Sequence, residues 1–335
     1  MRLLFETSGE HPTLPGAEIE ATGEAVAGRR PRTSSDGAAI VAACPRTSAV
    51  EMAGRLALCH SVSEILDEQA SLRKATGSKA LAAIEGETVK ARAAIASGPW
   101  TKAQQLAAER SVGAVLAKRN NIDLRHPEAE IRIILGSRVR ICRLIHKVDR
   151  TGFEARKGEK RPFFSPIVLH PKYARALVNL SCVRPGARLL DPFCGTGGIL
   201  IEAALAGAEA LGSDLDPRMV AGSRENLAHF GLAAGRLERC DVAEIPDVFG
   251  TVGAIATDPP YGRASSTGKE RPGSLYKRML DAFADALPDG GRAAVVLPDL
   301  SIVRKLPRGL KMQESHALRV HRSLVRHFVV LRKND

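Results

Sequence analysis

Apolar residues follow two different patterns along the chain, one before and one after about residue 150. In the first part, the apolar positions of 101–116 recur every three or four residues behind a threonine, which predicts a capped helix. The apolar runs 130–135 and 139–145 flank a short turn that contains Gly136, and they predict a β-hairpin. Short strands mixed with helices are typical of an α+β region.

From residue 169 onward, short buried runs alternate with helical stretches. The expected strands are 187–191, 210–214, 237–241, 252–258 and 292–297, and the expected helices are 197–206, 217–230 and 274–287. Two further β-rich runs lie within 317–331 with no helix between them, so they predict a closing hairpin. Strands that alternate with helices predict an α/β fold with a parallel, doubly wound sheet.

The segment between these two parts shows neither periodicity. Residues 152–166 combine glycine, proline and clustered basic residues, which is typical of a connection between domains. We therefore expect an N-terminal α+β domain at 1–150, a linker at 151–168 and an α/β domain at 169–335. Phe163 and Phe164 are expected to pack the linker against the protein.

Composition narrows the class of protein. The 335 residues are 44% hydrophobic and 26% charged, as in ordinary globular proteins, which argues against a disordered or collagen-like chain. No run of 18 apolar residues occurs, and the apolar run at the N-terminus is too short for a secretory signal. The six cysteines form no CxxC pair, so we expect free thiols in the cytoplasm and no metal site.

Basic residues exceed acidic ones and gather in two segments. The net charge is +12, with a net +9 over 118–175 and a net +7 over 301–335. Such an excess attracts phosphate groups and favours a nucleic-acid partner. Charge alone leaves open the alternative of a basic protein without such a partner.

The first candidate functional motif follows the expected strand 187–191. It consists of Asp191, Pro192, Phe193, Cys194, Gly195, Thr196, Gly197 and Gly198. The glycines allow the backbone to approach a ligand, and the following helix directs its N–H groups toward the same place. The leading carboxylate would repel a pyrophosphate, but it suits a cofactor with cationic groups such as S-adenosylmethionine.

Two further acidic residues follow the next expected strands. Asp214 stands about 20 residues after the glycine loop begins, where a carboxylate binds ribose hydroxyls in this architecture. Asp216 precedes Pro217 and is expected to cap a helix instead. Asp241, followed by Val242, is a candidate acceptor for the adenine amino group, and a turn-forming role is nearly as well supported.

The motif Asp258-Pro259-Pro260-Tyr261 follows the expected strand 252–258. An amino group on a base ring is a poor nucleophile because its lone pair is delocalised into the ring. Asp258 and the Pro259 carbonyl offer acceptors for its N–H bonds, and proline removes competing donors. Tyr261 offers a stacking face for an extruded base. The alternative is a structural Pro-Pro turn with a surface tyrosine.

These motifs resemble a known family. DPFCGTGG, GSD and DPPYG, in this order, resemble S-adenosylmethionine-dependent methyltransferases that act on exocyclic amines of bases. The stretch 161–198 is similar to the archaeal tRNA guanine-N2 methyltransferases that modify position 10. That family joins an N-terminal THUMP RNA-binding domain to a Rossmann-like class I methyltransferase domain.

The resemblance implies mono- and then dimethylation of a guanine 2-amino group in tRNA, with S-adenosylmethionine as the cofactor. It places the target amine at Asp258, Pro259, Pro260 and Tyr261. It places the cofactor at Asp191, Pro192, Gly195, Thr196, Gly197, Asp214, Asp241 and Val242. We further expect a monomer with no membrane partner. We expect a packing role for Tyr276, and we expect Glu202 to lie on a helix face without acting as a catalytic acid.

Two other functions remain open on the sequence. The same chemistry could act on rRNA or on DNA adenine or cytosine, although no base-reading domain is evident in the residues after Tyr261. A tRNA chaperone with a vestigial catalytic fold is the third hypothesis. The three acids Asp191, Asp214 and Asp258 at expected strand ends argue against it.

Overall fold

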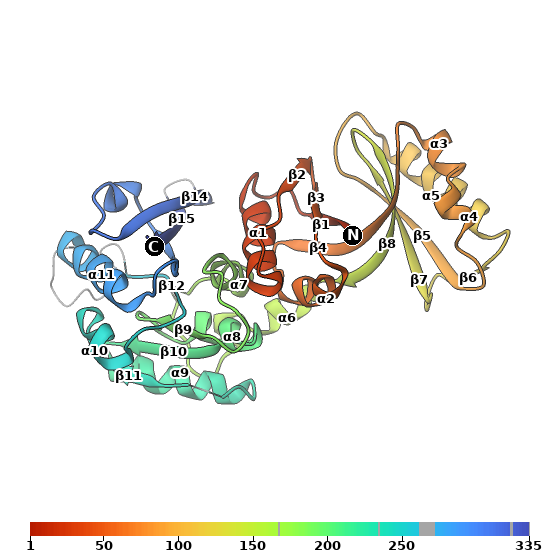
Figure 1. Ribbon diagram of the computed structural model, residues 1–335. Helices are drawn as coiled ribbons and strands as arrows, with labels where there is room; N and C mark the ends of the chain where they lie inside the picture. Colours follow the sequence, from red (N-terminus) through yellow and green to blue (C-terminus); the bar gives the residue numbers. More distant parts are fainter. Residues whose placement is uncertain (167, 234, 261–271, 322–323, 335) are drawn as a thin grey trace. The chain divides into compact units, whose positions relative to one another are not determined.

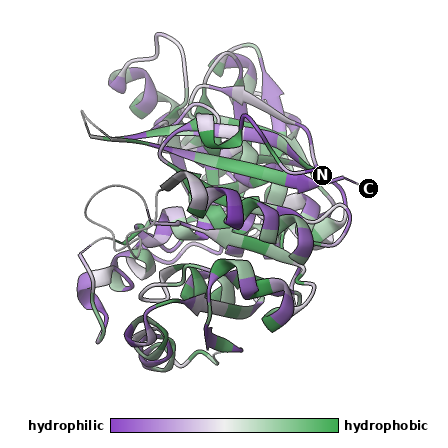
Figure 2. Ribbon diagram, turned by 90° about the vertical axis from the view of Figure 1, so that its left-hand side faces the viewer, coloured by the Kyte–Doolittle hydropathy of each residue, from purple (hydrophilic) through white to green (hydrophobic). Residues whose placement is uncertain are grey.

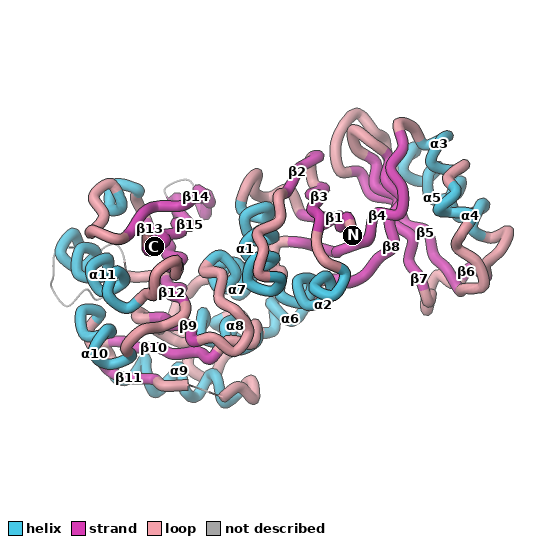
Figure 3. The backbone as a smooth tube through the Cα atoms, viewed as in Figure 1, coloured by secondary structure: helices cyan, strands magenta, loops and turns pink. Residues whose placement is uncertain are grey.

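The computed structural model describes residues 1–166, 168–233, 235–260, 272–321 and 324–334. The chain forms two compact units, Met1–Val148 and Asp149–Asp335 (Figure 1). Each unit combines helices with one β-sheet (Figure 3).

The N-terminal unit is built on an eight-stranded sheet. Its strands are β1 (Arg2–Thr7), β2 (Thr33–Asp36), β3 (Ala39–Ala43), β4 (Cys59–Gln69), β5 (Thr88–Ile95), β6 (Asn121–Ile122), β7 (Ala129–Leu135) and β8 (Val139–Lys147). Its helices are α1 (Leu14–Ala27), α2 (Arg46–Arg55), α3 (Leu72–Thr76), α4 (Lys79–Ala82) and α5 (Lys102–Leu116). The strand order is β2-β3-β1-β4-β8-β7-β5-β6, and the pattern confirms an α+β unit.

Two elements predicted in this unit are confirmed. Helix α5 begins after Thr101, whose side chain accepts a hydrogen bond from the backbone of Gln104 while the Gln104 side chain accepts one from the backbone of Thr101. Strands β7 and β8 pair antiparallel, with Leu135 opposite Val139 on either side of the turn.

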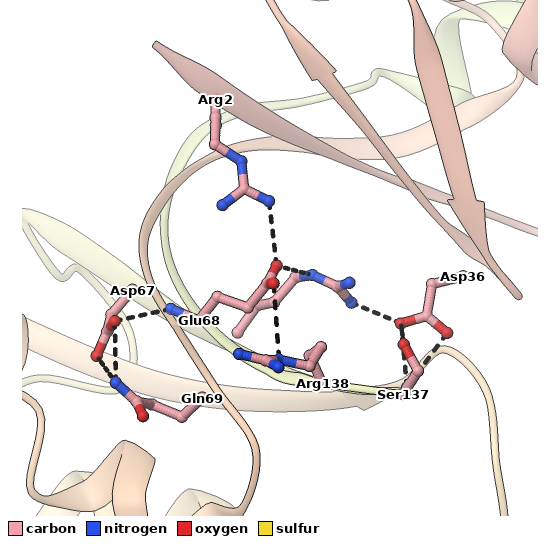
Figure 4. A network of polar contacts seen from close by, with 8 residues as sticks. Arg2, Asp36, Asp67, Glu68, Gln69, Ser137 and Arg138 are labelled. Carbon is pink, nitrogen blue, oxygen red and sulfur yellow. Dashed lines mark hydrogen bonds and ion pairs between the residues drawn. The ribbon is translucent and has the colours of Figure 1, made fainter.

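A polar network crosses the same sheet (Figure 4). Arg140 forms ion pairs with Asp36 at 2.6 Å and with Glu68 at 2.8 Å, and its side chain is 8% exposed. Arg2 and Arg138 also contact Glu68. The positive charges of these three arginines are therefore neutralised by acids within the N-terminal unit.

The C-terminal unit contains a seven-stranded sheet. Its strands are β9 (Arg188–Asp191), β10 (Glu209–Asp214), β11 (Leu237–Arg239), β12 (Ala254–Thr257), β13 (Arg292–Leu297), β14 (Leu310–His321) and β15 (Leu324–Lys333). They lie in the order β11-β10-β9-β12-β13-β15-β14. The first five of these are parallel, and β15 runs antiparallel to both β13 and β14. This arrangement confirms the predicted α/β fold with a closing hairpin.

Helices precede the first strand of this unit and connect its parallel strands. They are α6 (Arg150–Ala155), α7 (Pro171–Leu180), α8 (Gly198–Leu205), α9 (Pro217–His229), α10 (Ile245–Phe249) and α11 (Pro272–Ala286), with 3-10 turns η1 (Gly158–Lys160), η2 (Val242–Glu244) and η3 (Leu300–Val303). Hydrophobic residues lie along the strands and on parts of the helices (Figure 2). In the core, Ile255 and Val295 of the sheet pack in one buried cluster with Met279 and Phe283 of α11.

The segment expected to be an irregular linker differs from the prediction, because it contains α6 and η1. Asp149 caps α6 by accepting a hydrogen bond from the backbone of Gly152. The helix has only 6 residues, which is too short to show a periodicity.

Of the two phenylalanines expected to anchor the linker, only Phe163 packs as predicted. Its ring occupies the space beside Gly222 of α9, where a Cβ atom would lie 2.0 Å from the ring. Asn226 fixes the backbone of Phe163 through hydrogen bonds of 3.0 Å and 2.8 Å. Phe164 is 50% exposed, so the expectation was wrong for this residue. Gly222 of α9 leaves room for one aromatic ring, and the ring of Phe163 fills this space.

Within the described ranges, none of the helices combines the length and the apolar character that crossing a membrane requires. The same part of the chain contains no group of three or more His, Cys, Asp or Glu side chains that could hold a metal ion.

Candidate active site

Three of the predicted acids meet at the carboxyl edge of the C-terminal sheet. Asp191 ends β9, Asp214 ends β10, and Asp258 directly follows β12. Strand β9 lies between β10 and β12 in the sheet. The chain continues from β9 through β10 and β11 on one side and through β12 and β13 on the other, so the strand order reverses at β9. Such a switch point opens a crevice for ligands. A cavity of about 440 Å³ lies there, and all three acids line it.

Most residues assigned to the site from the sequence line this one cavity. They are Asp191, Pro192, Gly195, Thr196, Asp214, Asp241, Val242, Asp258, Pro259 and Pro260. Gly197 is not among the lining residues. It is the N-cap residue before α8, with a φ of 77°, and a Cβ atom there would lie 3.0 Å from Ser223 Oγ. Tyr261 lies outside the described residues.

Asp191 is buried at the base of the cavity. Its Oδ1 accepts hydrogen bonds from Thr257 Oγ1 at 2.6 Å and from the backbone N–H of Phe193 at 3.2 Å. Burial raises the pKa of Asp191 to about 7, and the carboxylates of Asp214 and Asp258 add to this shift. A cationic group bound beside Asp191 would favour its ionised form.

Asp214 is held by the backbone of the loops around it. Its Oδ2 accepts a hydrogen bond of 3.0 Å from the Gly195 N–H, and its Oδ1 accepts one of 3.0 Å from the Asp216 N–H. Each oxygen retains a further lone pair that can accept a hydroxyl proton. Asp216 caps α9 by accepting from the Arg218 backbone N–H at 2.9 Å, as predicted.

Asp241 has the turn-forming contacts that the sequence left open. Its Oδ1 accepts a hydrogen bond of 2.9 Å from the Ala243 N–H at the start of η2, and Arg278 forms an ion pair with the same oxygen. Asp241 also lines the cavity. A structural role and a place at the ligand are therefore compatible for this residue.

The carboxylate of Asp258 has an oxygen that is available to accept a hydrogen bond. Its Oδ1 is buried and has no hydrogen-bond partner among the described residues. Burial raises the pKa of Asp258 to about 6, and the positive charge of Arg326 acts in the opposite direction. Pro259 and Pro260 have no backbone N–H to satisfy it.

Tyr276 stabilises the turn that contains Asp258, Pro259 and Pro260. It is 5% exposed in the core, which confirms the packing role expected for it, and its hydroxyl donates a hydrogen bond of 3.3 Å to the carbonyl oxygen of Pro260.

Several lining residues were missed from the sequence. Ser165, Val168 and Leu169 come from the segment before α7, and Met219 and Leu275 come from helices. They carry no charge or motif of their own. The one available signal was that the stretch 161–198, which contains the first three, resembles one family throughout.

The residues present fit S-adenosylmethionine. The cavity is within the usual range of about 300–1,000 Å³ for ligand pockets. It offers Asp214 for hydroxyl groups and Asp191 for a cationic group, beside a glycine loop that opens a helix. Asp258, whose buried Oδ1 has no hydrogen-bond partner among the described residues, also lines the cavity and could accept a hydrogen bond from an amine. Fold and site together define a class I, S-adenosylmethionine-dependent methyltransferase.

Comparison with known proteins agrees with this class. The family model described as RMKL-like, methyltransferase domain, matches residues 158–327. The tRNA (guanine(10)-N2)-dimethyltransferase of Methanothermobacter thermautotrophicus is 34% identical over 99% of this chain and 100% of its own length. The enzyme of the same name from Pyrococcus abyssi is 35% identical over 67% of this chain and 68% of its own length.

A solved structure agrees as well. The crystal structure of TrmN from Thermus thermophilus matches with a TM-score of 0.57 and 26% identity, over 99% of this chain and 100% of that one. The chain belongs to the family of tRNA guanine-N2 methyltransferases with an RMKL-like methyltransferase domain.

Proposed function

We propose that this enzyme transfers methyl groups from S-adenosylmethionine to the 2-amino group of guanine 10 in tRNA, first once and then twice. The names of the two archaeal relatives support the base, the position and the dimethylation. A Thermus relative, 31% identical over 63% of this chain, is named for guanine 6 of tRNA, so the position is the part that most needs a test. Action on rRNA or on DNA adenine or cytosine is the alternative.

One observation carries the proposal at the level of chemistry, namely the buried, unpartnered Oδ1 of Asp258 beside Pro259 in the cavity. A ring amine becomes nucleophilic when its N–H bonds are held out of the plane of the ring. Asp258 Oδ1 and the Pro259 carbonyl oxygen are acceptors suited to the two N–H groups of a guanine amine. Tyr276 fixes the next carbonyl and so supports this geometry.

The reaction divides between cofactor and protein. When bound, S-adenosylmethionine supplies a methyl group on a sulfonium, and the sulfur keeps the electron pair of the C–S bond as the N–C bond forms. Asp258 accepts a hydrogen bond from the amine and can take the proton that the nitrogen loses. Asp191 would hold the cationic part of the bound cofactor, and Asp214 would hold its ribose.

We further propose that the N-terminal unit is the tRNA-binding part and contains the THUMP domain. The net charge of +12 favours a phosphate-rich partner. Catalysis as a monomer in the cytoplasm stays a prediction.

Nucleoside mass spectrometry tests the substrate. Unmodified tRNA transcript is incubated with the enzyme and methyl-labelled S-adenosylmethionine, next to a transcript in which guanine 10 is replaced by adenine. We expect mono- and dimethylguanosine in the first transcript and neither in the second. Equal labelling of both would contradict the position, and labelling of an rRNA fragment or duplex DNA in preference to tRNA would contradict the substrate.

A further inference from the structure

A cluster of charged side chains lies behind the glycine loop. Glu202 of α8 is fully buried. Its Oε1 pairs with Arg156 Nε at 2.7 Å, and its Oε2 pairs with Arg175 Nη2 at 2.9 Å. Glu202, expected to lie on a helix face without acting as a catalytic acid, is thus a buried anion that binds two arginines with both of its oxygens.

A third arginine, Arg161, belongs to the same cluster without a carboxylate of its own. Its Nε donates to the Arg156 carbonyl at 2.9 Å, and its Nη1 lies 3.4 Å from Thr196 Oγ1. The residue is 5% exposed, and its Nη2 is buried with no hydrogen-bond partner among the described residues. Burial lowers the pKa of Arg161, and the charge of Glu202, which already pairs with two other arginines, offsets this only in part. An anion bound nearby would therefore stabilise the Arg161 cation.

The guanidinium group of Arg161 lies against the wall of the cofactor cavity. Thr196 and Gly198, which it contacts, both line that cavity. A Cβ atom on Gly198 would lie 3.0 Å from Arg161 Nη1, so the missing side chain allows this approach.

The cavity lacks a positive charge of its own. Its described lining residues include the acids Asp191, Asp214, Asp216, Asp241 and Asp258, and no lysine or arginine is among them. The amino-acid end of S-adenosylmethionine carries an ammonium group, which suits these acids, and a carboxylate, which they repel. Within a poorly solvated wall, a cation several ångströms away still attracts that carboxylate strongly.

We propose that Arg161 is a positioning residue that neutralises the carboxylate of the cofactor's methionine part from behind the glycine loop. This orients the amino-acid end, with the carboxylate toward Thr196 and Gly198 and the ammonium toward the acids. The inference rests on the cofactor of the proposed function, and it does not depend on which nucleic acid is methylated.

Calorimetry with two ligands tests this role without any turnover. S-adenosylhomocysteine has the carboxylate, and its decarboxylated analogue lacks that group and keeps the amine. We expect Arg161→Gln to weaken S-adenosylhomocysteine binding about tenfold or more, as for a lost hydrogen bond or contact to a charged group. Binding of the analogue should change less than about twofold. Arg161→Lys, which keeps the charge, should fall between wild type and Arg161→Gln.

The exposed Arg304→Gln serves as the matched control and should leave both affinities unchanged. Equal losses for the two ligands in Arg161→Gln would show a merely structural role and overturn the proposal, as would no loss for either. If a variant does not fold, the affinities of the wild type for the two ligands still test the proposal. Equal wild-type affinities for both ligands would contradict it. A wild type that binds S-adenosylhomocysteine but methylates no tRNA would contradict the proposed function and leave the role of Arg161 standing.

Discussion

The carboxylates of Asp191 and Asp258 lie in one cavity and are both poorly solvated, but their contacts differ. Asp191 is satisfied by two donors on one oxygen, whereas Asp258 has a buried oxygen with no partner among the described residues. Burial raises the pKa of both groups. The ligand-free protein therefore holds negative charge at a cost that a bound cation or N–H donor relieves.

Asp191→Asn should make the ligand-free protein more stable at high pH and weaken its binding of S-adenosylmethionine. Both hydrogen bonds of Asp191 end on Oδ1, which asparagine keeps. Because the folded-state pKa is raised to about 7, the wild type loses stability relative to the variant as the pH rises from about 4 to about 7. Thermal unfolding at pH 5 and pH 8 measures this difference.

The exposed Asp285→Asn is the matched control, and it should differ little from wild type at either pH. A difference between Asp191→Asn and wild type that shrinks with rising pH would contradict the account.

The rate of methyl transfer should fall at acid pH. Asp258 must be ionised to accept the amine N–H, and its pKa is raised to about 6. With both substrates well below saturation, where the rate reports groups of the ligand-free enzyme, it should be level well above pH 7 and fall at least about tenfold for each pH unit well below 6. A rate independent of pH from 5 to 8 would show that the carboxylate form is not required.

The sequence revealed the acids of the site, because each one ends or follows a recognisable strand. It did not reveal how they are solvated. That Asp258 Oδ1 lacks a partner depends on β12, on two prolines and on the helix that carries Tyr276, which are brought together only by folding.

At the scale of elements, the segment before α7 is bound tightly to the C-terminal unit. Phe163 packs on Gly222, while Ser165, Val168 and Leu169 line the cavity. The segment thus forms part of the cofactor site, although its Gly, Pro and basic residues predict only a linker. Local periodicity carries no information on such packing, since its contacts are with residues about 60 positions away.

Gly222→Ala should destabilise the C-terminal unit by about 1–3 kcal/mol, because the new methyl group overlaps the Phe163 ring. It should also weaken cofactor binding, since Phe163 holds the segment that lines the cavity. Gly113→Ala in α5 is the control, as a Cβ atom there meets nothing within 4 Å. The control should gain about 0.5–1 kcal/mol from helix propensity.

Thermal unfolding and calorimetry of both variants check these values. Equal changes in stability, of the same sign, for Gly222→Ala and Gly113→Ala would show that the close contact at Phe163 is unimportant.

At the scale of the whole molecule, the basic composition overstates the charge available to a partner. Of the net +9 over 118–175, several arginines are bound to acids within the protein, among them Arg132, Arg140, Arg143, Arg156 and Arg175. Their acidic partners lie far away in the sequence, so a charge count along the chain does not detect the pairing. The family and the site support a nucleic-acid partner more strongly than the charge of this segment does.

Arg140→Gln should therefore reduce the stability of the N-terminal unit by about 3 kcal/mol, because it leaves the charge of Asp36 unpaired and removes the shortest of the ion pairs of Glu68. Arg138→Gln is the control. Its side chain is 49% exposed and lies 3.7 Å from Glu68, so the cost should stay below about 1 kcal/mol. Trp100, the one tryptophan of the chain, lies in this unit and reports its unfolding in denaturant by fluorescence. Equal losses in the two variants would contradict this ranking.

The central claim is that Asp258 holds the reacting amine beside the methyl donor. Asp258→Asn separates catalysis from cofactor binding most directly, when labelled methyl transfer to tRNA and calorimetric binding of S-adenosylmethionine are measured on the same preparation. We predict that transfer falls at least about a hundredfold, as for loss of a general base, while cofactor affinity changes less than about threefold. Methylation at the wild-type rate, or a label found on a ring atom or a ribose oxygen, would contradict the account.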